Sequence, residues 1–465
     1  MSIIIPANSA AGGGVYDVAN SLMFNGPDSA NMTRSASGSS ATKSTFSFWV
    51  KRSKLADTQI IHNFYSATTT YNKLYFDGND QFIMKQQVSG STQIQIMPSM
   101  KFRDTSAWYH IVYIVDPTES TEANRVKVYV NGIQITSFGT STYPAEDAAV
   151  RVEYNQFIGR EYSGDTKFFN GYLAEFVFLD GVAASIGDLG EFDEDSGIWK
   201  PINVSGLTFG SRGFYLDFED SSDLGNDAVG SNNFTANNLA ATDQATDTCT
   251  NNFATMNIID AGGPSLTFSN GNTTIVSSDN TWRSGFNTIA PSKGKWYFEA
   301  KYVGSSTNNW IGVVDTEQVN STSNTGDFKI TDRSRFYGIS QTGQKGNNGS
   351  ESNWGSSYSQ NDIVGVAFDL DNHKIYFSKD GTFQNSGNPE SGATGTGSMY
   401  DLATGYFYMV GSSYYSSSAS ISYNFGSPYF AISSGNSDAD GHGNFEYAVP
   451  SGYFALCTKN LAEYG

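Results

Sequence analysis

One short segment gathers the acidic residues that hydrolytic chemistry would need. Residues 191–196 read EFDEDS, so carboxylates stand at alternating positions. Retaining hydrolysis of a glycosidic bond uses two carboxyl groups about 5–5.5 Å apart, which alternate positions of a β-strand can supply. Here Ser196 stands where a third acid would complete the set, and the segment lies in a polar region before 199–201 (WKP). We therefore expect no catalytic residue here and interpret the chain as a non-enzyme.

The histidines do not form a catalytic or metal-binding pattern. His62, His110, His373 and His442 are scattered along the chain. His110 lies in an apolar stretch that reads as a strand, and His373 lies in a turn, so both favour structural roles. The sequence also lacks a G-x-S-x-G motif, a Gly-rich phosphate loop at a helix start and a paired-histidine zinc motif.

Calcium is the one metal for which the sequence offers candidate ligands, and we expect no other cofactor. Asp77, Asn79 and Asp80 lie in one polar turn, and a second acidic stretch contains Asp217, Glu219, Asp220 and Asp223. Calcium takes about six to eight oxygen ligands, which clustered loop carboxylates can supply. Asp is also common in turns because its side chain bonds to nearby backbone. Turn chemistry is therefore the alternative interpretation.

Two Ser- and Gly-rich segments carry the aromatic residues that we predict to contact a ligand. Trp354 and Tyr358 lie in 344–360, and Tyr414 and Tyr415 lie in 411–419. Tyr with Ser, Gly and Asn is the composition of adaptable binding loops, and aromatic rings stack on the apolar C–H faces of sugars. The alternative is that these rings fold back onto the body of the domain.

These residues must be positioned by β-strands. In 363–381 (IVGVAFDLDNHKIYFSKDG) apolar residues alternate with small or polar ones on both sides of a polar turn, and Asp380-Gly381 marks a second turn. The segments 108–115 and 125–135 repeat this arrangement before the Asn131-Gly132 turn. An aromatic strand ending in Lys precedes each pair, at Lys51 and at Lys301, and the spacing from Lys to turn is nearly equal. One architecture used twice explains the repeat.

Composition excludes several classes of protein. Aromatic residues make up 14% and charged residues 16% of the 465 residues, which suits short strands with many polar turns. The formal charge of −19 disfavours binding to nucleic acid or to anionic membranes. Cys249 and Cys457 form no disulfide framework, which favours synthesis in a reducing compartment. The N-terminus resembles neither a signal peptide nor an anchor, and no apolar run reaches membrane-spanning length, so we expect no membrane insertion.

The pattern divides the chain into four parts. Residues 1–20 are small, Gly-rich and unpatterned, and we expect either a disordered end or an arm that docks on a larger assembly. Strand patterns fill 21–220 and resume in 264–465. Between them, 221–263 is dominated by Asn, Asp, Thr, Ala and Gly, which predicts a long polar linker. The predicted fold class is all-β, with two jelly-roll-type β-sandwiches joined by this linker.

Specific stretches resemble known families. The strands FSFWVKR, WYHIVYIVD, RVKVYVNG and GYLAEFVFLDG make 21–220 similar to laminin-G-like, concanavalin-A-like sandwiches. The stretches GKWYFEAKY, WIGVVD, DIVGVAFDLDNHKIYFSKDG and GYFALCTKNL make 264–465 resemble a SPRY domain. The segments GFYLDFEDSSDLGNDAVG and DTCTNNFATMN resemble linkers in tail and appendage proteins of bacteriophages.

The resemblance implies a bacteriophage virion structural protein: a tail fibre, a knob or another appendage made in the host cytoplasm. Its non-catalytic domains would contact a host surface glycan or protein in host recognition. The alternative is a decoration or joining subunit that contacts only other virion proteins, and a polysaccharide-degrading glycosidase is third. The resemblance also implies a homo-oligomer, a trimer by family expectation, with other virion proteins as partners.

Overall fold

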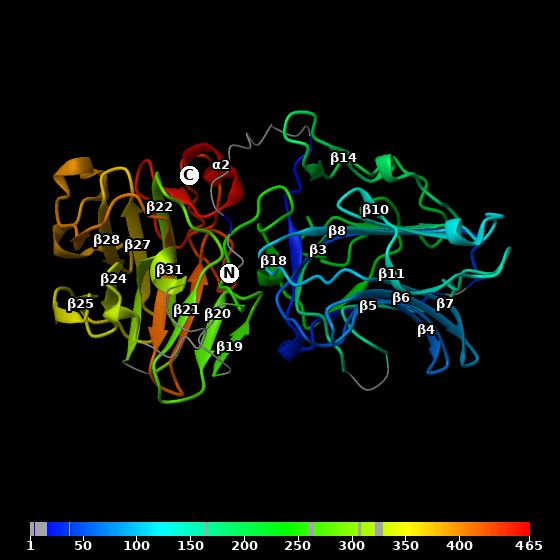
Figure 1. The fold of residues 1–465 in the computed structure, drawn as a ribbon, viewed down its shortest axis with the longest axis horizontal. Helices are drawn as coiled ribbons and strands as arrows, with labels where there is room; N and C mark the ends of the chain where they lie inside the picture. Colours follow the sequence, from blue (N-terminus) through cyan, green and yellow to red (C-terminus); the bar gives the residue numbers. More distant parts are fainter. Residues whose placement is uncertain are drawn as a thin grey trace. The chain divides into compact units, whose positions relative to one another are not determined.

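The chain folds into two separate compact units. The computed structural model describes residues 4, 16–36, 38–162, 166–259, 265–305, 308–320 and 329–465. The first unit is Gly12–Thr250, and the second is Asn251–Gly465 joined by Ile4 from the N-terminal segment. Each unit contains two large, mostly antiparallel sheets, which confirms the all-β fold class (Figure 1).

The first unit stacks two sheets. Sheet A has the order β10-β9-β8-β3-β13-β1-β18, with β16 paired to β13, and sheet B has the order β11-β7-β6-β5-β4-β12-β2-β17. The strands of sheet A are β1 (Ser21–Phe24), β3 (Ser44–Arg52), β8 (Tyr109–Val115), β9 (Val126–Val130), β10 (Ile133–Ile135), β13 (Gly171–Asp180), β16 (Phe214–Leu216) and β18 (Gln244–Ala245). The strands of sheet B are β2 (Asn31–Arg34), β4 (Gln59–Ala67), β5 (Thr70–Phe76), β6 (Phe82–Val88), β7 (Ser91–Pro98), β11 (Phe138–Thr142), β12 (Asn155–Ile158) and β17 (Thr235–Asn237). A short hairpin pairs β14 (Glu191–Phe192) with β15 (Trp199–Lys200).

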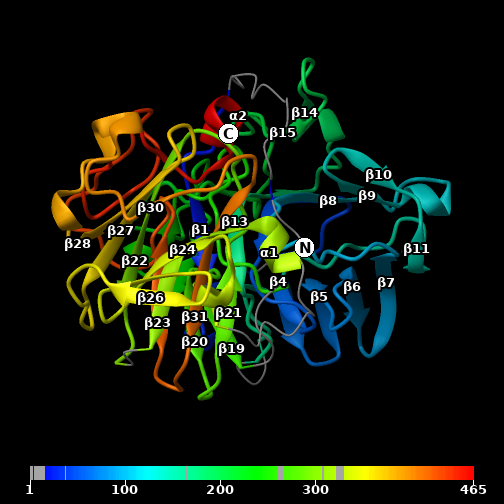
Figure 2. The same ribbon diagram turned by 60° about the vertical axis from the view of Figure 1, so that its left-hand side comes forward.

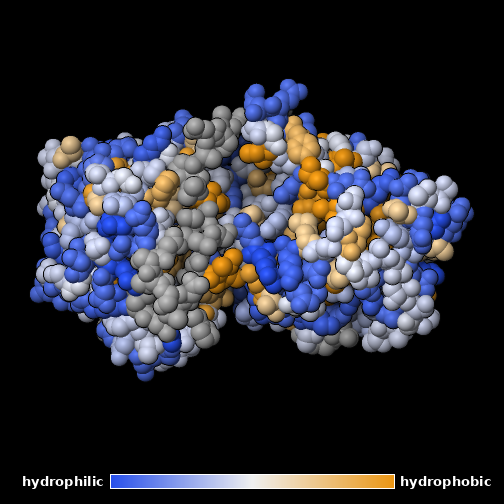
Figure 3. All heavy atoms as spheres, viewed as in Figure 1, coloured by the Kyte–Doolittle hydropathy of each residue, from blue (hydrophilic) through white to orange (hydrophobic). Residues whose placement is uncertain are grey.

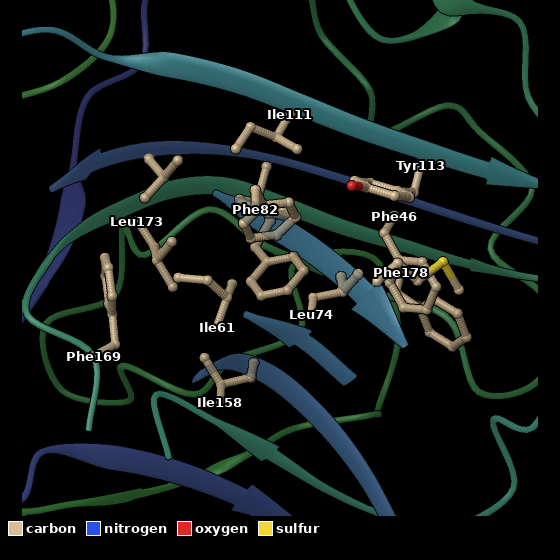
Figure 4. Packing of buried hydrophobic residues seen from close by; sticks show 14 of the residues in the cluster. Phe46, Ile61, Leu74, Phe82, Ile111, Tyr113, Ile158, Phe169, Leu173 and Phe178 are labelled. Carbon is tan, nitrogen blue, oxygen red and sulfur yellow. The ribbon is translucent and has the colours of Figure 1, made fainter. Parts of the chain in front are cut away.

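The core of the first unit lies between these sheets because alternate residues of each strand point inward. Figure 4 shows Phe46, Ile111 and Leu173 from sheet A facing Leu74 and Phe82 from sheet B. All five side chains are almost completely buried. The residues between them in β5 and β6 therefore point away from the core, to the outer face of sheet B.

The second unit repeats the two-layer arrangement. Sheet C has the order β19-β20-β32-β22-β27-β28-β29, with β30 paired to β28 and β33 to β22, and sheet D has the order β21-β31-β23-β24-β25-β26 (Figure 2). The strands of sheet C are β19 (Leu266–Ser269), β20 (Thr274–Ser277), β22 (Lys295–Tyr302), β27 (Ile363–Asp369), β28 (Lys374–Lys379), β29 (Thr382–Phe383), β30 (Tyr400–Asp401), β32 (Ser420–Asn424) and β33 (Phe454–Ala455). The strands of sheet D are β21 (Arg283–Phe286), β23 (Asn309–Asp315), β24 (Phe336–Ser340), β25 (Gln344–Asn347), β26 (Ser350–Asn353) and β31 (Tyr408–Tyr414). Two short helices, α1 (Thr316–Asn320) and α2 (Thr458–Tyr464), accompany them, and neither approaches the length of a membrane span within the described part of the chain.

The segment predicted as a linker is different in the structure. Residues 221–250 belong to the first unit, where β17 pairs with β2 and β18 pairs with β1. Leu224 and Phe234 are buried in its core. Asp247 forms a 2.6 Å ion pair with Lys51, and both side chains are only 1% exposed. Sparse apolar residues and one buried carboxylate hold a polar segment that has no strand periodicity of its own.

The N-terminal segment also contacts the chain itself at its described residues. The Ile4 amide donates to the Thr288 carbonyl at 2.7 Å in the second unit. In the first unit, the Tyr16 hydroxyl donates to Glu175 at 2.9 Å, and the Val18 amide donates to Thr250. The predicted arm thus includes docked residues, and its remaining residues, 1–3 and 5–15, lie outside those that the structure describes.

The buried ion pair yields a stability prediction. In the Asp247→Asn variant, the Lys51 ammonium loses its counter-charge in a buried site, which costs about 3 kcal/mol or more of unfolding free energy. Hydrogen exchange of the β3 and β13 amides, read by mass spectrometry on the full chain, measures this loss. The control is Asp57→Asn, because Asp57 and its partner Lys54 are 46% and 54% exposed and the pair contributes little. Equal protection in both variants would contradict the prediction.

Candidate functional site

The acidic segment 191–196 forms a surface hairpin. Its first two residues, Glu191 and Phe192, form the short strand β14. The Asp193 carboxylate accepts hydrogen bonds from the Ser196 amide and hydroxyl, both at 2.9 Å. It also forms an ion pair with Lys200 at 3.1 Å. Hydrogen bonds from Ser196 lower the pKa of Asp193 to about 2. Glu191 also pairs with Lys200, so these carboxylates stabilise the turn and the hairpin.

Two histidines are buried in the first unit. His62 lies in the core, where its Nε2 is 3.1 Å from the Gln156 side-chain oxygen. His110 accepts the Trp199 indole N–H on Nδ1 at 2.8 Å, and its Nε2 is 2.8 Å from the Ser47 hydroxyl. Burial lowers the pKa of both imidazoles to about 3. The geometry gives His110 a structural task, because it fixes the β14–β15 hairpin to sheet A through Trp199.

The predicted calcium residues do not assemble into a ligand set. Asp80 is buried and accepts hydrogen bonds from Arg52 at 3.1 Å and Arg103 at 3.0 Å, so two guanidinium groups neutralise it. One oxygen of Asp77 accepts two backbone amides of the same turn, including that of Asn79 at 2.9 Å. Turn and core interactions therefore use the carboxylates that calcium would need.

The second acidic stretch makes turn interactions as well. Asp217 accepts the Glu219 amide at 3.1 Å, and Asp220 accepts the amide and hydroxyl of Ser222. Among the described residues, no group of three or more His, Cys, Asp and Glu side chains has the arrangement of a metal site.

The side chains of two of the four aromatic residues predicted to bind a ligand, Tyr358 and Tyr414, point into the core. Tyr358 is 3% exposed and stacks on Tyr302 with ring centroids 5.8 Å apart. Tyr414 is completely buried in β31, and its hydroxyl lies 2.8 Å from that of Tyr423. Strand β31 extends into the segment predicted as a loop, and its alternation turns Tyr414 inward. The half-buried Trp354 packs against the core of the same unit, which is the alternative stated for these rings.

Tyr415 is the exposed member of the predicted set. It is 37% exposed and lies 5.1 Å, ring centroid to centroid, from Trp282. The ammonium group of Lys329 lies 5.0 Å from the centre of the Trp282 ring. The structure thus does not bring Tyr415 together with the other three predicted residues on an open surface.

A larger aromatic surface lies on the outer face of sheet B. Tyr71, Lys73 and Tyr75 occupy alternate positions of β5, and Tyr65 in β4 is directly opposite Tyr71. Lys85 in β6 is directly opposite Lys73. Each of these five side chains is partly exposed. We call this surface the tyrosine face; it also includes Phe157 and Tyr162, which extend it beyond β4.

The rings at one end of the tyrosine face form a continuous group. Tyr65 and Tyr162 stack with centroids 4.1 Å apart and planes inclined by 25°. Tyr162 also contacts Phe157 at 5.2 Å and remains 45% exposed. This end presents aromatic ring surface to solvent on a strand framework, and such rings can stack against the apolar face of a ligand.

Lys73 links the rings to a charged group. Its ammonium lies 4.7 Å from the Tyr71 ring centre and 5.0 Å from that of Tyr75, positions that favour cation–π attraction. It also pairs with Glu161 at 2.9 Å. Burial lowers the pKa of Lys73 despite the Glu161 contact, and the like charges of Lys167 and Lys85 lower it further. Burial raises the pKa of Tyr75 to about 12, so its phenol stays protonated and can donate a hydrogen bond.

Sequence reasoning about loops missed this face, although a signal for it exists. The segment TYNKLYF (Thr70–Phe76) alternates Tyr, Lys and Tyr with Asn72, Leu74 and Phe76, which are buried. A period of two therefore places two tyrosines and a lysine on one face of a single strand. Which sheet face remains open to solvent depends on the partner sheet, which one strand does not reveal.

Comparison with known families identifies both sandwiches. Residues 25–184 match the Laminin_G_3 model, described as the concanavalin A-like lectin/glucanases superfamily. Residues 295–400 match the SPRY domain model. The chain thus carries a laminin-G-like, concanavalin A-like domain followed by a SPRY domain. No curated protein is significantly similar to the chain.

Solved structures give matches to parts of the chain. The SPRY domain of human HERC1 is 15% identical, with 36% of this chain and 96% of that one covered and a TM-score of 0.29. A protein from Bacteroides ovatus described as a putative carbohydrate binding protein is 15% identical, with 48% of this chain and 59% of that one covered and a TM-score of 0.35. The heptameric SAP-like pentraxin of Limulus polyphemus is 15% identical, covering 37% and 81%, with a TM-score of 0.28.

The buried histidines predict how stability depends on pH. The pKa of His62 is about 3 when folded and about 6.5 when unfolded, so its contribution is complete above pH 6.5 and is lost as pH falls towards 3. From pH 7 to pH 5 this loss is about 2 kcal/mol. The stability difference between the wild type and His62→Gln, measured by denaturant unfolding, should change by that amount in favour of the variant.

The comparison with a variant is needed because other groups titrate in the same range. Burial raises the pKa of Glu175 to about 7, and a buried acid of this kind gains stability as pH falls. Its contribution is common to both proteins and cancels in the difference. A difference that stays constant between pH 7 and pH 5 would contradict the assignment of His62 as a buried neutral base.

Proposed function

We propose that this chain is a non-catalytic glycan-binding component of a bacteriophage particle, and that its first unit holds a host surface glycan on the tyrosine face. The observation that carries the binding proposal is the row of Tyr65, Tyr71 and Tyr75 on the outer side of sheet B, extended by the exposed Tyr162. Sugar rings expose apolar C–H faces between their hydroxyl groups, and aromatic rings with nearby polar groups match that pattern.

The surroundings of the rings favour recognition of a sugar. Gln87 lies directly opposite Tyr71, and Gln95 lies directly opposite Lys85, so amide groups flank the aromatic row. Amides and phenols both donate and accept hydrogen bonds, as sugar hydroxyls require. The match of 25–184 to a superfamily of lectins and glucanases supports the same class of ligand.

The charges on this face favour binding over hydrolysis. Hydrolysis with retention needs a pair of carboxyl groups about 5–5.5 Å apart. On the described part of the tyrosine face, Glu161 accepts hydrogen bonds from both Lys73 and Lys167. These bonds lower the pKa of Glu161 although burial opposes them, so this carboxylate stays ionised and is poorly suited to act as an acid.

The placement on a phage particle rests on the resemblance of residues 213–230 and 247–257 to segments of phage tail and appendage proteins. The particle would supply other virion proteins as partners, and a trimer would present several tyrosine faces to one host surface. Such multivalency raises avidity without new contacts in each site. Mass spectrometry of purified particles tests this part of the proposal, which fails if the chain is absent from them.

A second candidate function is that of a joining or decoration subunit. Ile133, Phe192 and Ile198 are 59%, 46% and 55% exposed. They belong to one region, because Gly132 and Phe192 both contact the Trp199 ring, and Figure 3 shows apolar surface beside the β14 hairpin. Exposed apolar patches mark protein contacts. Loss of incorporation into particles in Phe192→Ser/Ile198→Ser, with glycan binding intact, would favour this function.

The glycan proposal predicts a loss of affinity. Tyr71→Ala/Tyr75→Ala removes two stacking surfaces and should weaken binding of the full chain to a glycan array, or to host cells, by about tenfold or more. Tyr415→Ala is the control, because it removes a partly exposed tyrosine from the second unit. Unchanged thermal unfolding shows that the double variant is folded. A loss of binding in the control alone would place the ligand in the second unit instead.

A further inference from the structure

Two lysines on the tyrosine face oppose one another without a counter-charge for both. Lys73 in β5 and Lys85 in β6 are direct cross-strand partners in the antiparallel register. Like charges directly opposite each other destabilise a sheet. The arrangement stands out because the whole chain has 46 acidic against 27 basic residues. Acidic partners are abundant in this sequence, yet an acidic residue does not occupy either position.

The ion pairs around these lysines leave positive charge uncompensated. Glu161 pairs with Lys73 at 2.9 Å and also pairs with Lys167, so one carboxylate serves two ammonium groups. Lys85 makes neither an ion pair nor a side-chain hydrogen bond with any residue in the described part of the chain. Three ammonium groups therefore outnumber the carboxylates of Glu161 and of Asp77, which acts on Tyr75, and this leaves a local surplus of positive charge beside the tyrosine rings.

We propose that the tyrosine face is specific for an anionic glycan, whose carboxylate, sulfate or phosphate group lies between Lys73 and Lys85. This inference rests on the proposed function and adds the chemical class of the ligand. An anion at this point offsets the repulsion between the two ammonium groups and gains charge-assisted hydrogen bonds from both. Because the free protein carries that repulsion, part of the binding free energy comes from its relief.

The spacing of the strand allows stacking and charge recognition together. Outward positions on one strand repeat about every 6.6 Å, so Tyr71 and Tyr75 lie one step to either side of Lys73. A sugar ring on one tyrosine can thus extend its acidic substituent towards the lysine pair. Gln95, directly opposite Lys85 on β7, adds an amide donor at the same level of the sheet.

The rest of the molecule sharpens this specificity. A net charge of −19 repels polyanions in general, so the surplus of positive charge on this face is a local exception. An anionic ligand is then attracted to the tyrosine face in preference to other parts of the surface. A neutral glycan gains only the stacking and hydroxyl contacts.

The test measures binding of the full chain to an array of matched glycans, which are either neutral or carry carboxylate, sulfate or phosphate groups. The array includes uronic acid oligomers and their neutral methyl esters. We expect the bound glycans to be anionic, and esterification to remove binding. Lys85→Gln should weaken binding of the anionic glycans by about tenfold or more. The matched control is Lys101→Gln, an exposed lysine of the same unit, which should leave affinity unchanged. The arms with different acidic groups identify the group recognised.

A second measurement needs no ligand. Lys85→Gln removes a like-charge contact, so the melting temperature of the free protein should stay the same or rise. A fall would mean that Lys85 has a structural role and would overturn the inference. The inference would also be overturned if neutral and anionic glycans bound equally well, and if this binding were lost in Tyr71→Ala/Tyr75→Ala but kept in Lys85→Gln. That result would leave the proposed function intact. Absence of binding to any glycan would overturn both.

Discussion

The need to cover one apolar face of every sheet controls this structure. Along a strand the side chains point alternately to the two faces, so each strand can serve the core with only half of its residues. In β5, Leu74 and Phe76 pack against sheet A, and this fixes the outward direction of Tyr71, Lys73 and Tyr75. The same constraint that forms the core thus builds the tyrosine face, and core packing holds its rings on a rigid framework.

Buried charged residues fix the irregular segments that apolar packing alone does not place. The Lys51–Asp247 pair fixes a polar segment to sheet A, and the Trp108 indole donates to the second oxygen of Asp247 at 3.1 Å. In the second unit, the buried Glu299 accepts backbone amides of Glu446 and Tyr447 at 3.0 and 2.8 Å. A buried charge is costly unless it is paired and hydrogen-bonded, so each contact selects one placement of its segment. These contacts determine where irregular segments lie against the sheets.

Strands present the tyrosine row and the lysine pair of the proposed site, while Tyr162 lies in the loop after β12. A side chain on a sheet loses less freedom on binding than one on a mobile loop, because its backbone is already ordered. The cross-strand register also sets which residues are neighbours, so Tyr65 meets Tyr71 and Lys73 meets Lys85. The unusual lysine pair is therefore a property of register, and a shift of one residue in either strand would turn the lysine of that strand into the core.

The sequence by itself determined the all-β fold class, the two similar sandwiches and most of their core strands, because alternation and turn residues are local signals. Strand β7, which begins with the polar residues Ser91, Thr92 and Gln93, and the hairpin of β25 and β26 were missed, since their polar composition resembles that of a loop. Only the tertiary structure decided that Tyr358 and Tyr414 are buried while Tyr71 and Tyr75 are partly exposed. Burial depends on which sheet packs against which face, and that is settled by residues far apart in the chain.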